Sequence, residues 1–257
     1  MGIKLGFQDQ ANLRHDPTQA WIYVVGHING DVELLKKTLV RIEFSQLLAR
    51  NDKVVFLGNF LGEGGHNKEI IEILREYQNV RPGQVIILRG RAENRMIGCR
   101  LMWLKSLEGL KALESYKTKW VLPLVVESFK KMDASQFCID RRWLINLPFF
   151  YKSEKYFFCH SGVDPEKPLG DQKMGALLYL DLDFYQSSRI YPKKIVHSCY
   201  ESKLVVKSNR IAVGRPPDAV QCVVINDKKD AHGNFGKDLE NMLFIQKYPD
   251  KPKEAVK

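Results

Sequence analysis

Histidine, asparagine and arginine side chains gather in four short glycine-containing segments, and these residue types bind metals or oxyanions. The segments are 26–30 (GHING), 58–64 (GNFLGEG), 89–95 (RGRAENR) and 160–162 (HSG). Imidazole nitrogens bind borderline metals such as Zn²⁺, whereas guanidinium groups bind phosphate and carboxylate, often through two parallel hydrogen bonds. The residue types therefore predict either a metal centre or an anion-binding centre, provided that the fold brings the segments together.

The first three segments each follow a short apolar run and precede a stretch with apolar residues at helical spacing. The apolar runs are 21–25, 53–57 and 85–88. Three strand–loop–helix units predict an α/β fold with a largely parallel central sheet. Ligand sites in such sheets lie beyond the carboxyl ends of the strands, so we expect the three loops to meet at one edge of the sheet.

The rest of the chain divides into a helical region and a second set of strands. Residues 92–147 are rich in Leu, Met, Trp and Lys at helical spacing, which predicts a helical insertion. We expect a second sheet, completing a sandwich, from strands at 156–159, 194–196, 204–206, 210–213, 222–225 and 242–246. Residues 1–20 are predicted to be an N-terminal extension, 21–246 the folded domain and 247–257 a charged, mobile tail.

The order and flanks of the four segments resemble the signature loops of a known family. They are similar to G-D-x-H-G, G-D-x-x-D-R-G, R-G-N-H-E-N-R and the later histidine loop of the calcineurin-like metallophosphoesterases, in the phosphoprotein (serine/threonine) phosphatase branch. A fifth segment, 194–200 (KIVHSCY), resembles the K-I-V-H-G-H-T of that branch. The resemblance spans about residues 20 to 226 and implies a β-sandwich of two sheets flanked by helices, with a helical insertion.

The chain departs from the family at most positions that the family uses for chemistry. Carried over by position, the ligands of the family's two-metal centre become His27, Asn29, Asn59, Arg91, His160 and Cys199. Of these only His160 keeps the residue type. The resemblance also places Ala92 at the general-acid histidine, and Gly62 and Glu63 at the aspartate and arginine that support it and bind phosphate. The segment 214–217 (GRPP) stands where the family has D-T-G.

These departures predict that the chain has lost its metals and its catalysis. Two divalent cations held close together need several anionic oxygen ligands. A guanidinium at Arg91 is positively charged and has no lone pair to donate. We therefore expect no cofactor and interpret the chain as a pseudophosphatase that acts as a binding or scaffold module.

Three alternatives for the remodelled loops stay open from the sequence. In the first, Arg91 pairs with Glu93 or Glu63 and plays a structural part. In the second, Arg89, Arg91 and Arg95 form a metal-free anion site with the loop amides. In the third, the chain is an active phosphoesterase with one or two divalent metals (Mn, Fe or Zn) at a rebuilt site, with ligands drawn from His27, His160, Cys199 and His197.

Composition narrows the class of partner and the compartment. The 257 residues carry a formal net charge of +10, which favours an acidic partner. We expect a protein, with nucleic acid or a ribonucleoprotein as the alternative, although no base-reading motif is present. The five cysteines are odd in number and widely spaced, which is typical of reduced thiols in the cytoplasm. No secretory leader and no apolar run of about 20 residues occurs, so we expect a cytoplasmic protein without a membrane.

Overall fold

The fold was examined in a computed structural model, which describes residues 20–44, 52–98, 109, 111, 115–116, 136–179, 182–199, 201–216, 219–227 and 239–246. The predicted N-terminal extension before residue 20, most of the helical insertion between 99 and 135, and the predicted tail at 247–257 lie outside the described residues. Within the described part of the chain, no helix has the length and apolar character needed to cross a membrane.

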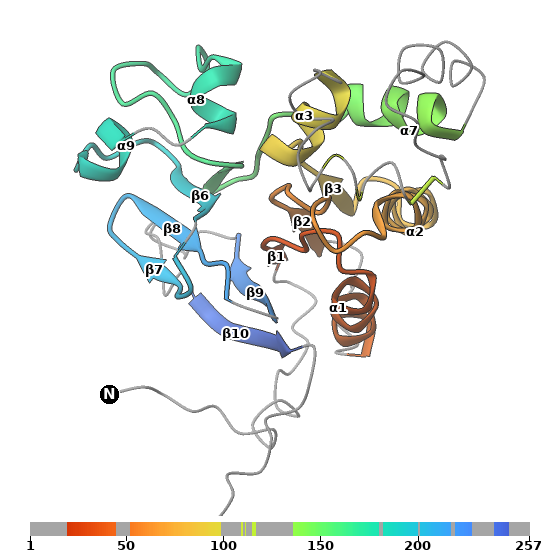
Figure 1. Ribbon diagram of the computed structural model, residues 1–257. Coiled ribbons are helices and arrows are strands. Elements are labelled where there is room, and N and C mark those ends of the chain that lie inside the picture. The colour runs from red at the N-terminus through yellow and green to blue at the C-terminus, as the bar shows by residue number, and fades with distance from the viewer. Residues whose placement is uncertain are drawn as a thin grey trace, which may run out of the picture.

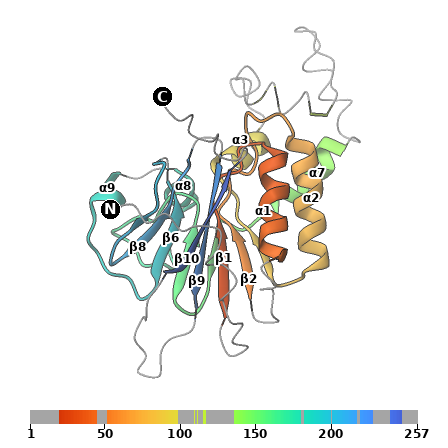
Figure 2. The ribbon, with the colours of Figure 1, turned by 90° about the horizontal axis from the view of Figure 1, so that it is seen from below.

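Two five-stranded sheets pack face to face, as the sequence predicts (Figures 1 and 2). The first sheet contains, in spatial order, β10 (Leu239–Gln246), β9 (Ala219–Asn226), β1 (Trp21–Val25), β2 (Lys53–Phe56) and β3 (Val85–Ile87). The second contains β4 (Phe150–Lys152), β5 (Tyr156–Cys159), β6 (Lys194–Ser198), β8 (Arg210–Val213) and β7 (Val205–Val206).

Helices cover both outer faces of the sandwich. Helices α1 (Val32–Phe44) and α2 (Asn67–Val80) lie on the first sheet, and the short helices α8 (Met174–Leu178) and α9 (Leu182–Gln186) lie beside the second (Figure 2). Helices α3 (Arg91–Gly98) and α7 (Gln136–Ile145) follow β3 and contact each other. The fold is therefore the predicted α/β sandwich flanked by helices.

The apolar runs become strands because both of their faces are buried. Along β1, Tyr23 and Val25 pack against the helix layer, whereas Ile22 and Val24 pack toward the second sheet. In β5, Tyr156 and Phe158 fill the space between the sheets, and Phe157 joins the core under α9. Strands buried on both faces are continuous apolar runs and not alternating ones, which is how these segments read in the sequence.

The parallel core of each sheet brings the carboxyl ends of several strands to one edge. β1, β2 and β3 are parallel neighbours, and so are β5, β6 and β8. Two expectations from the sequence were wrong in detail. β9 and β10 join the first sheet by antiparallel pairing with β1, not the second. β4 was not predicted, because its three residues are only partly buried and carry little apolar signal.

Candidate functional site

Glycine residues allow the three strand-end loops of the first sheet to touch backbone to backbone. A Cβ atom at Gly64 would lie 2.2 Å from the Gly30 carbonyl oxygen, and one at Gly58 would lie 2.5 Å from the Gly90 nitrogen. Loops 26–30, 58–64 and 89–95 are therefore in direct contact, as predicted. Any side chain at these glycines would separate them, so packing alone accounts for this part of the loop pattern.

A buried carboxylate joins two of these loops. The Glu93 side chain is 0% exposed. Its Oε2 accepts hydrogen bonds from the backbone nitrogens of Asn59 and Gly90, both at 2.8 Å, and its Oε1 accepts one from Leu61 at 2.9 Å. Desolvation raises the pKa of Glu93 to about 7, although the backbone hydrogen bonds act in the opposite direction.

The expected ion pair between Arg91 and Glu93 is wrong. Both oxygens of Glu93 are used by loop amides, and its electrostatic partner is Arg89. The other expected partner, Glu63, is exposed on the second loop. The sequence offers no sign of this, because an acidic residue beside arginines suggests an ion pair whereas the amide donors come from residues more than thirty positions away.

Asn59, at the position of the family's bridging aspartate, has a structural role. Its backbone is in the left-handed region, with φ of 54°. Its side-chain Oδ1 accepts a hydrogen bond from the Ala92 nitrogen at 2.9 Å, which caps the first turn of α3. Asn29 also has a positive φ, 56°, and it contacts loop 58–64 through its backbone: its nitrogen donates to the Asn59 carbonyl and its carbonyl accepts from Gly64.

Two histidines from different sheets stack on each other at the carboxyl ends of the strands. His27 follows β1 and His160 follows β5, and their ring centroids are 5.4 Å apart with an interplanar angle of 22°. Both are almost fully buried. The His160 Nδ1 lies 2.8 Å from the Leu57 carbonyl oxygen. Because a carbonyl can only accept, Nδ1 carries the proton and Nε2 keeps a lone pair.

Burial and nearby positive charge keep both rings neutral at pH 7. Desolvation lowers the pKa of His160 to about 4, and Arg91 lowers it further. The pKa of His27 also lies well below its usual value, first because of burial and then because of His160, Arg215 and Arg91. Two arginines from separate loops therefore act on the stacked histidines.

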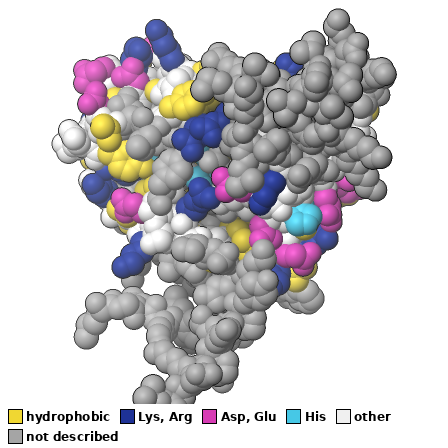
Figure 3. Space-filling model, viewed as in Figure 1, with side chains coloured by type: hydrophobic (Ala, Val, Ile, Leu, Met, Phe, Trp, Pro, Cys, Tyr) yellow, Lys and Arg dark blue, Asp and Glu magenta, His cyan; other side chains and the backbone are white. Residues whose placement is uncertain are grey.

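The predicted arginine trio is only partly present at this centre. The Arg89 guanidinium donates to the Ile145 carbonyl at the end of α7 and lies 4.3 Å above the Phe149 ring, so it serves the contact with α7. Arg91 acts on the histidine pair, and Arg95 is exposed one turn further along α3. Arg215, in the segment noted only as a departure, was missed as a site residue. Basic side chains gather around a small histidine surface in the middle of one face (Figure 3).

Comparison with known proteins shows the same architecture in phosphatase structures. No protein-family model and no curated protein matches the sequence. A proposed diadenosine tetraphosphatase matches with a TM-score of 0.54 at 13% identity, covering 89% of this chain and 94% of the other. A serine/threonine phosphatase from Saccharomyces cerevisiae, similar to human phosphatase PP5, matches with a TM-score of 0.52 at 14% identity, covering 90% and 82%. The chain has the metallophosphoesterase fold.

The residues at the metal positions of this fold do not fit a two-metal centre. Among the described residues, no group of three or more His, Cys, Asp or Glu side chains is arranged to hold a metal ion. Of the anionic oxygen donors that such a centre needs, the loops offer Glu93, which is fully engaged with backbone amides, and Glu63, which is exposed. The neighbouring guanidinium groups of Arg91 and Arg215 would repel a dication.

The residues of the possible rebuilt metal site do not all meet. His27 and His160 are in contact, but His197 packs between the rings of Phe184 and Tyr185, at 5.2 and 5.6 Å. Its Nδ1 lies 2.8 Å from the Ser198 carbonyl, and its Nε2 has no hydrogen-bond partner among the described residues. Burial raises the pKa of Cys199 to about 11, so its sulfur is a neutral thiol and not the thiolate that binds zinc.

The other positions carried over from the metallophosphoesterase pattern contribute backbone. Gly62 packs against Asn29, where a Cβ would lie 2.8 Å from the Asn29 carbonyl carbon. Ala92, at the general-acid position, is buried and has only a methyl side chain. Neither residue supplies a proton donor or a phosphate contact. The described loops therefore keep the backbone of the fold but lack its usual acid.

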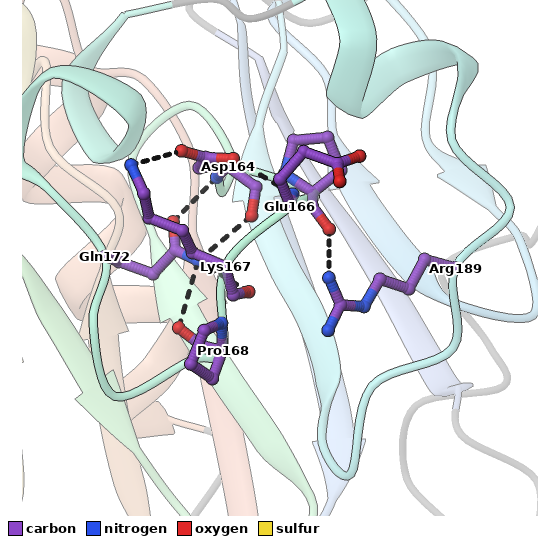
Figure 4. A network of polar contacts seen from close by, with 7 residues as sticks. Asp164, Glu166, Lys167, Pro168, Gln172 and Arg189 are labelled. Carbon is purple, nitrogen blue, oxygen red and sulfur yellow. Dashed lines mark hydrogen bonds and ion pairs between the residues drawn. The ribbon is translucent and has the colours of Figure 1, made fainter.

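The turn after His160 is fixed by a side-chain amide (Figure 4). Gln172 accepts from the Asp164 nitrogen at 2.6 Å and donates to the carbonyl oxygens of Asp164, Lys167 and Pro168 at 3.1 to 3.2 Å. Lys167 forms an ion pair with Asp164 at 2.8 Å. The Arg189 guanidinium donates to the Pro165 carbonyl oxygen. These contacts hold the segment that carries His160, and each polar group is used within the turn.

Proposed function

We propose that this chain is a catalytically inactive serine/threonine phosphatase-like protein that acts as a binding module. The observation that carries the proposal is the composition of the strand-end centre, where two neutral imidazoles are flanked by two arginines. Hydrolysis in a metallophosphoesterase fold needs anionic ligands to hold dications, because the metals supply both the activated water and the charge stabilisation. This centre has the opposite charge.

A metal-loading experiment tests the proposal. Purified full-length protein is incubated with manganese, iron and zinc salts, desalted, and analysed by plasma mass spectrometry, and hydrolysis of an aryl phosphate is assayed in parallel. We expect metal well below one equivalent and no turnover above buffer. About one or two equivalents of metal, with turnover lost in His160→Ala and kept in the exposed control His66→Ala, would contradict the proposal.

The second candidate is an active phosphoesterase with a non-standard metal site. The stacked pair His27 and His160 favours it, because two neutral imidazoles are good zinc ligands. Cys199 could join them only if a metal displaced its proton. The metal-loading experiment separates the two candidates directly, since this one requires both bound metal and turnover.

The partner proposed for the binding module is a protein with acidic character. The formal net charge of +10 supports an acidic partner, and the four described cysteines, Cys138, Cys159, Cys199 and Cys222, are free thiols, which suits a cytoplasmic location. Pull-down from cell extract with and without nuclease tests the class of partner. Capture that survives nuclease supports a protein, whereas capture that is lost with nuclease and falls steeply with salt supports nucleic acid or a ribonucleoprotein.

A further inference from the structure

We infer that Arg91 and Arg215, together with the stacked rings of His27 and His160, form a metal-free binding site for a phosphate-class oxyanion, either inorganic phosphate or a phosphate monoester. The inference rests on the proposed function, because a centre that held two dications would bind the same group through its metals. It assigns a ligand chemistry to the remodelled centre.

The four residues come from four strands and both sheets. His27 follows β1, Arg91 begins α3 after β3, His160 follows β5, and Arg215 follows β8. The parallel strands of each sheet place these loops at one edge, and the His27–His160 stack connects the two sheets there. Oxyanion sites are commonly built from loops at such an edge.

The charges that reach His27 are all positive or neutral. Besides burial, the groups that act on it are His160, Arg215 and Arg91, and each disfavours the protonated ring. No carboxylate is among them. A buried centre with this excess of positive charge is stabilised when an anion enters, because the anion offsets the repulsion between the arginines.

Arg215 has a free guanidinium on a fixed backbone. Among the described residues its side chain makes no hydrogen bond or ion pair, whereas its backbone nitrogen donates to the Glu201 carbonyl at 2.6 Å. The preceding residue, Gly214, donates to the Gln221 side chain at 2.5 Å and packs so closely that a Cβ would lie 2.7 Å from the Glu201 carbonyl oxygen. The guanidinium is exposed at the rim, so a ligand can approach it from solvent.

Loop rigidity favours binding without rearrangement. Glu93 ties loop 58–64 to the start of α3, and Asn59 caps that helix. Arg91 therefore projects from a backbone that is held by buried hydrogen bonds. Preorganised donors lose less entropy on binding, which makes a small anion a suitable ligand for this centre.

Phosphate titration of chelator-treated, full-length protein tests the site. Binding of inorganic phosphate and of phenyl phosphate is measured by isothermal titration calorimetry for the wild type, Arg215→Gln, Arg91→Gln and the control Arg142→Gln, which removes an exposed arginine from α7. We expect each site variant to bind about tenfold more weakly, as for loss of one charge-assisted hydrogen bond. The control should match the wild type, and Arg215→Gln should keep wild-type thermal unfolding because the side chain is exposed.

A second readout follows the histidines themselves. In an NMR pH titration, bound phosphate should raise the pKa of His27 because an adjacent anion stabilises the protonated ring. The rise should be reduced in Arg215→Gln and unchanged in Arg142→Gln. Equal phosphate affinity in all four proteins, or no movement of the His27 titration, would overturn the inference.

The outcomes separate this inference from the proposed function. Phosphate binding that survives chelation and depends on Arg215 supports both. No phosphate binding by protein that also lacks metal and turnover overturns the oxyanion site and leaves the non-catalytic proposal standing. Phosphate binding that disappears with chelation and returns with metal overturns both, because the centre would then be a metal site.

Discussion

The two ends of the sandwich use polar residues in opposite ways. At the amino end of β1, Asp227 accepts hydrogen bonds from the Ser153 hydroxyl at 2.5 Å and from the Lys155 nitrogen at 3.0 Å, while the buried Lys155 ammonium donates to the Asn226 carbonyl at 3.1 Å. At the carboxyl end, neutral histidines lie between arginines. The first end balances its charges within the fold, whereas the second keeps an excess of positive charge.

This difference shows where the chain has kept a capacity to bind. Polar groups that satisfy one another contribute to stability and have little left for a ligand. The strand-end centre has its backbone fixed by Glu93 and the loop glycines, but the Arg215 guanidinium is left without a partner among the described side chains. Changes at the two ends should therefore differ in kind, and changes to Glu93 should have the largest effect on stability.

Substitution Glu93→Gln should cost the most. A glutamine amide would place a donor against backbone donors and leave at least one buried N–H group without an acceptor. We expect a loss of about 3 kcal/mol in the free energy of unfolding, measured by urea denaturation at pH 7. The control is the exposed Glu63→Gln, which should stay within about 0.5 kcal/mol of the wild type. Equal stability of both variants would contradict the role given to Glu93.

Acidification should weaken the carboxyl end of the sandwich next. Burial lowers the pKa of His160 and of His197 to about 4, so the unfolded chain takes up protons first as the pH falls. Their contribution to stability is present above the unfolded pKa of about 6.5 and is lost as the pH falls through about 4. The loss should be on the order of 2 to 3 kcal/mol per histidine, and urea unfolding at pH 7, 6, 5 and 4 measures it.

Glu93 should oppose this trend, which gives the pH experiment a control. Its pKa is raised to about 7, so its contribution to stability is present below the unfolded value of about 4.3 and is lost as the pH rises through about 7. In Glu93→Gln the loss of stability between pH 7 and pH 5 should therefore be steeper than in the wild type. A shallower pH dependence in the variant would show that Glu93 titrates normally.

Substitution Asp227→Ala should give the smallest of these losses and should leave the binding centre intact. It removes the acceptors of Ser153, Lys155 and Glu154 in a partly exposed turn. We expect a loss of about 1 to 2 kcal/mol in chemical unfolding, with no change in phosphate binding. The exposed Asp171→Ala serves as the matched control. A change in phosphate affinity in Asp227→Ala would mean that the two ends are coupled.

The sequence by itself determined the scaffold of this protein. Continuous apolar runs such as 21–25, 156–159 and 210–213 could only be strands buried on both faces, and the structure has strands at those residues. Glycines at loop positions 30, 58, 64 and 90 predicted close contact between loops, which the backbone geometry requires. Such features depend on residues close in sequence, so local patterns reveal them. The fold and the residue types at the centre were therefore predictable.

Only the tertiary structure decided which side chains face one another. Glu93 bonds to amides more than thirty residues away and not to the adjacent Arg91, and His160 donates to Leu57, 103 residues before it. Arg89 turns toward α7 and Arg215 takes part in the centre in its place. These choices depend on which buried groups need a partner once the two sheets have packed, and spacing along the chain contains no information about that.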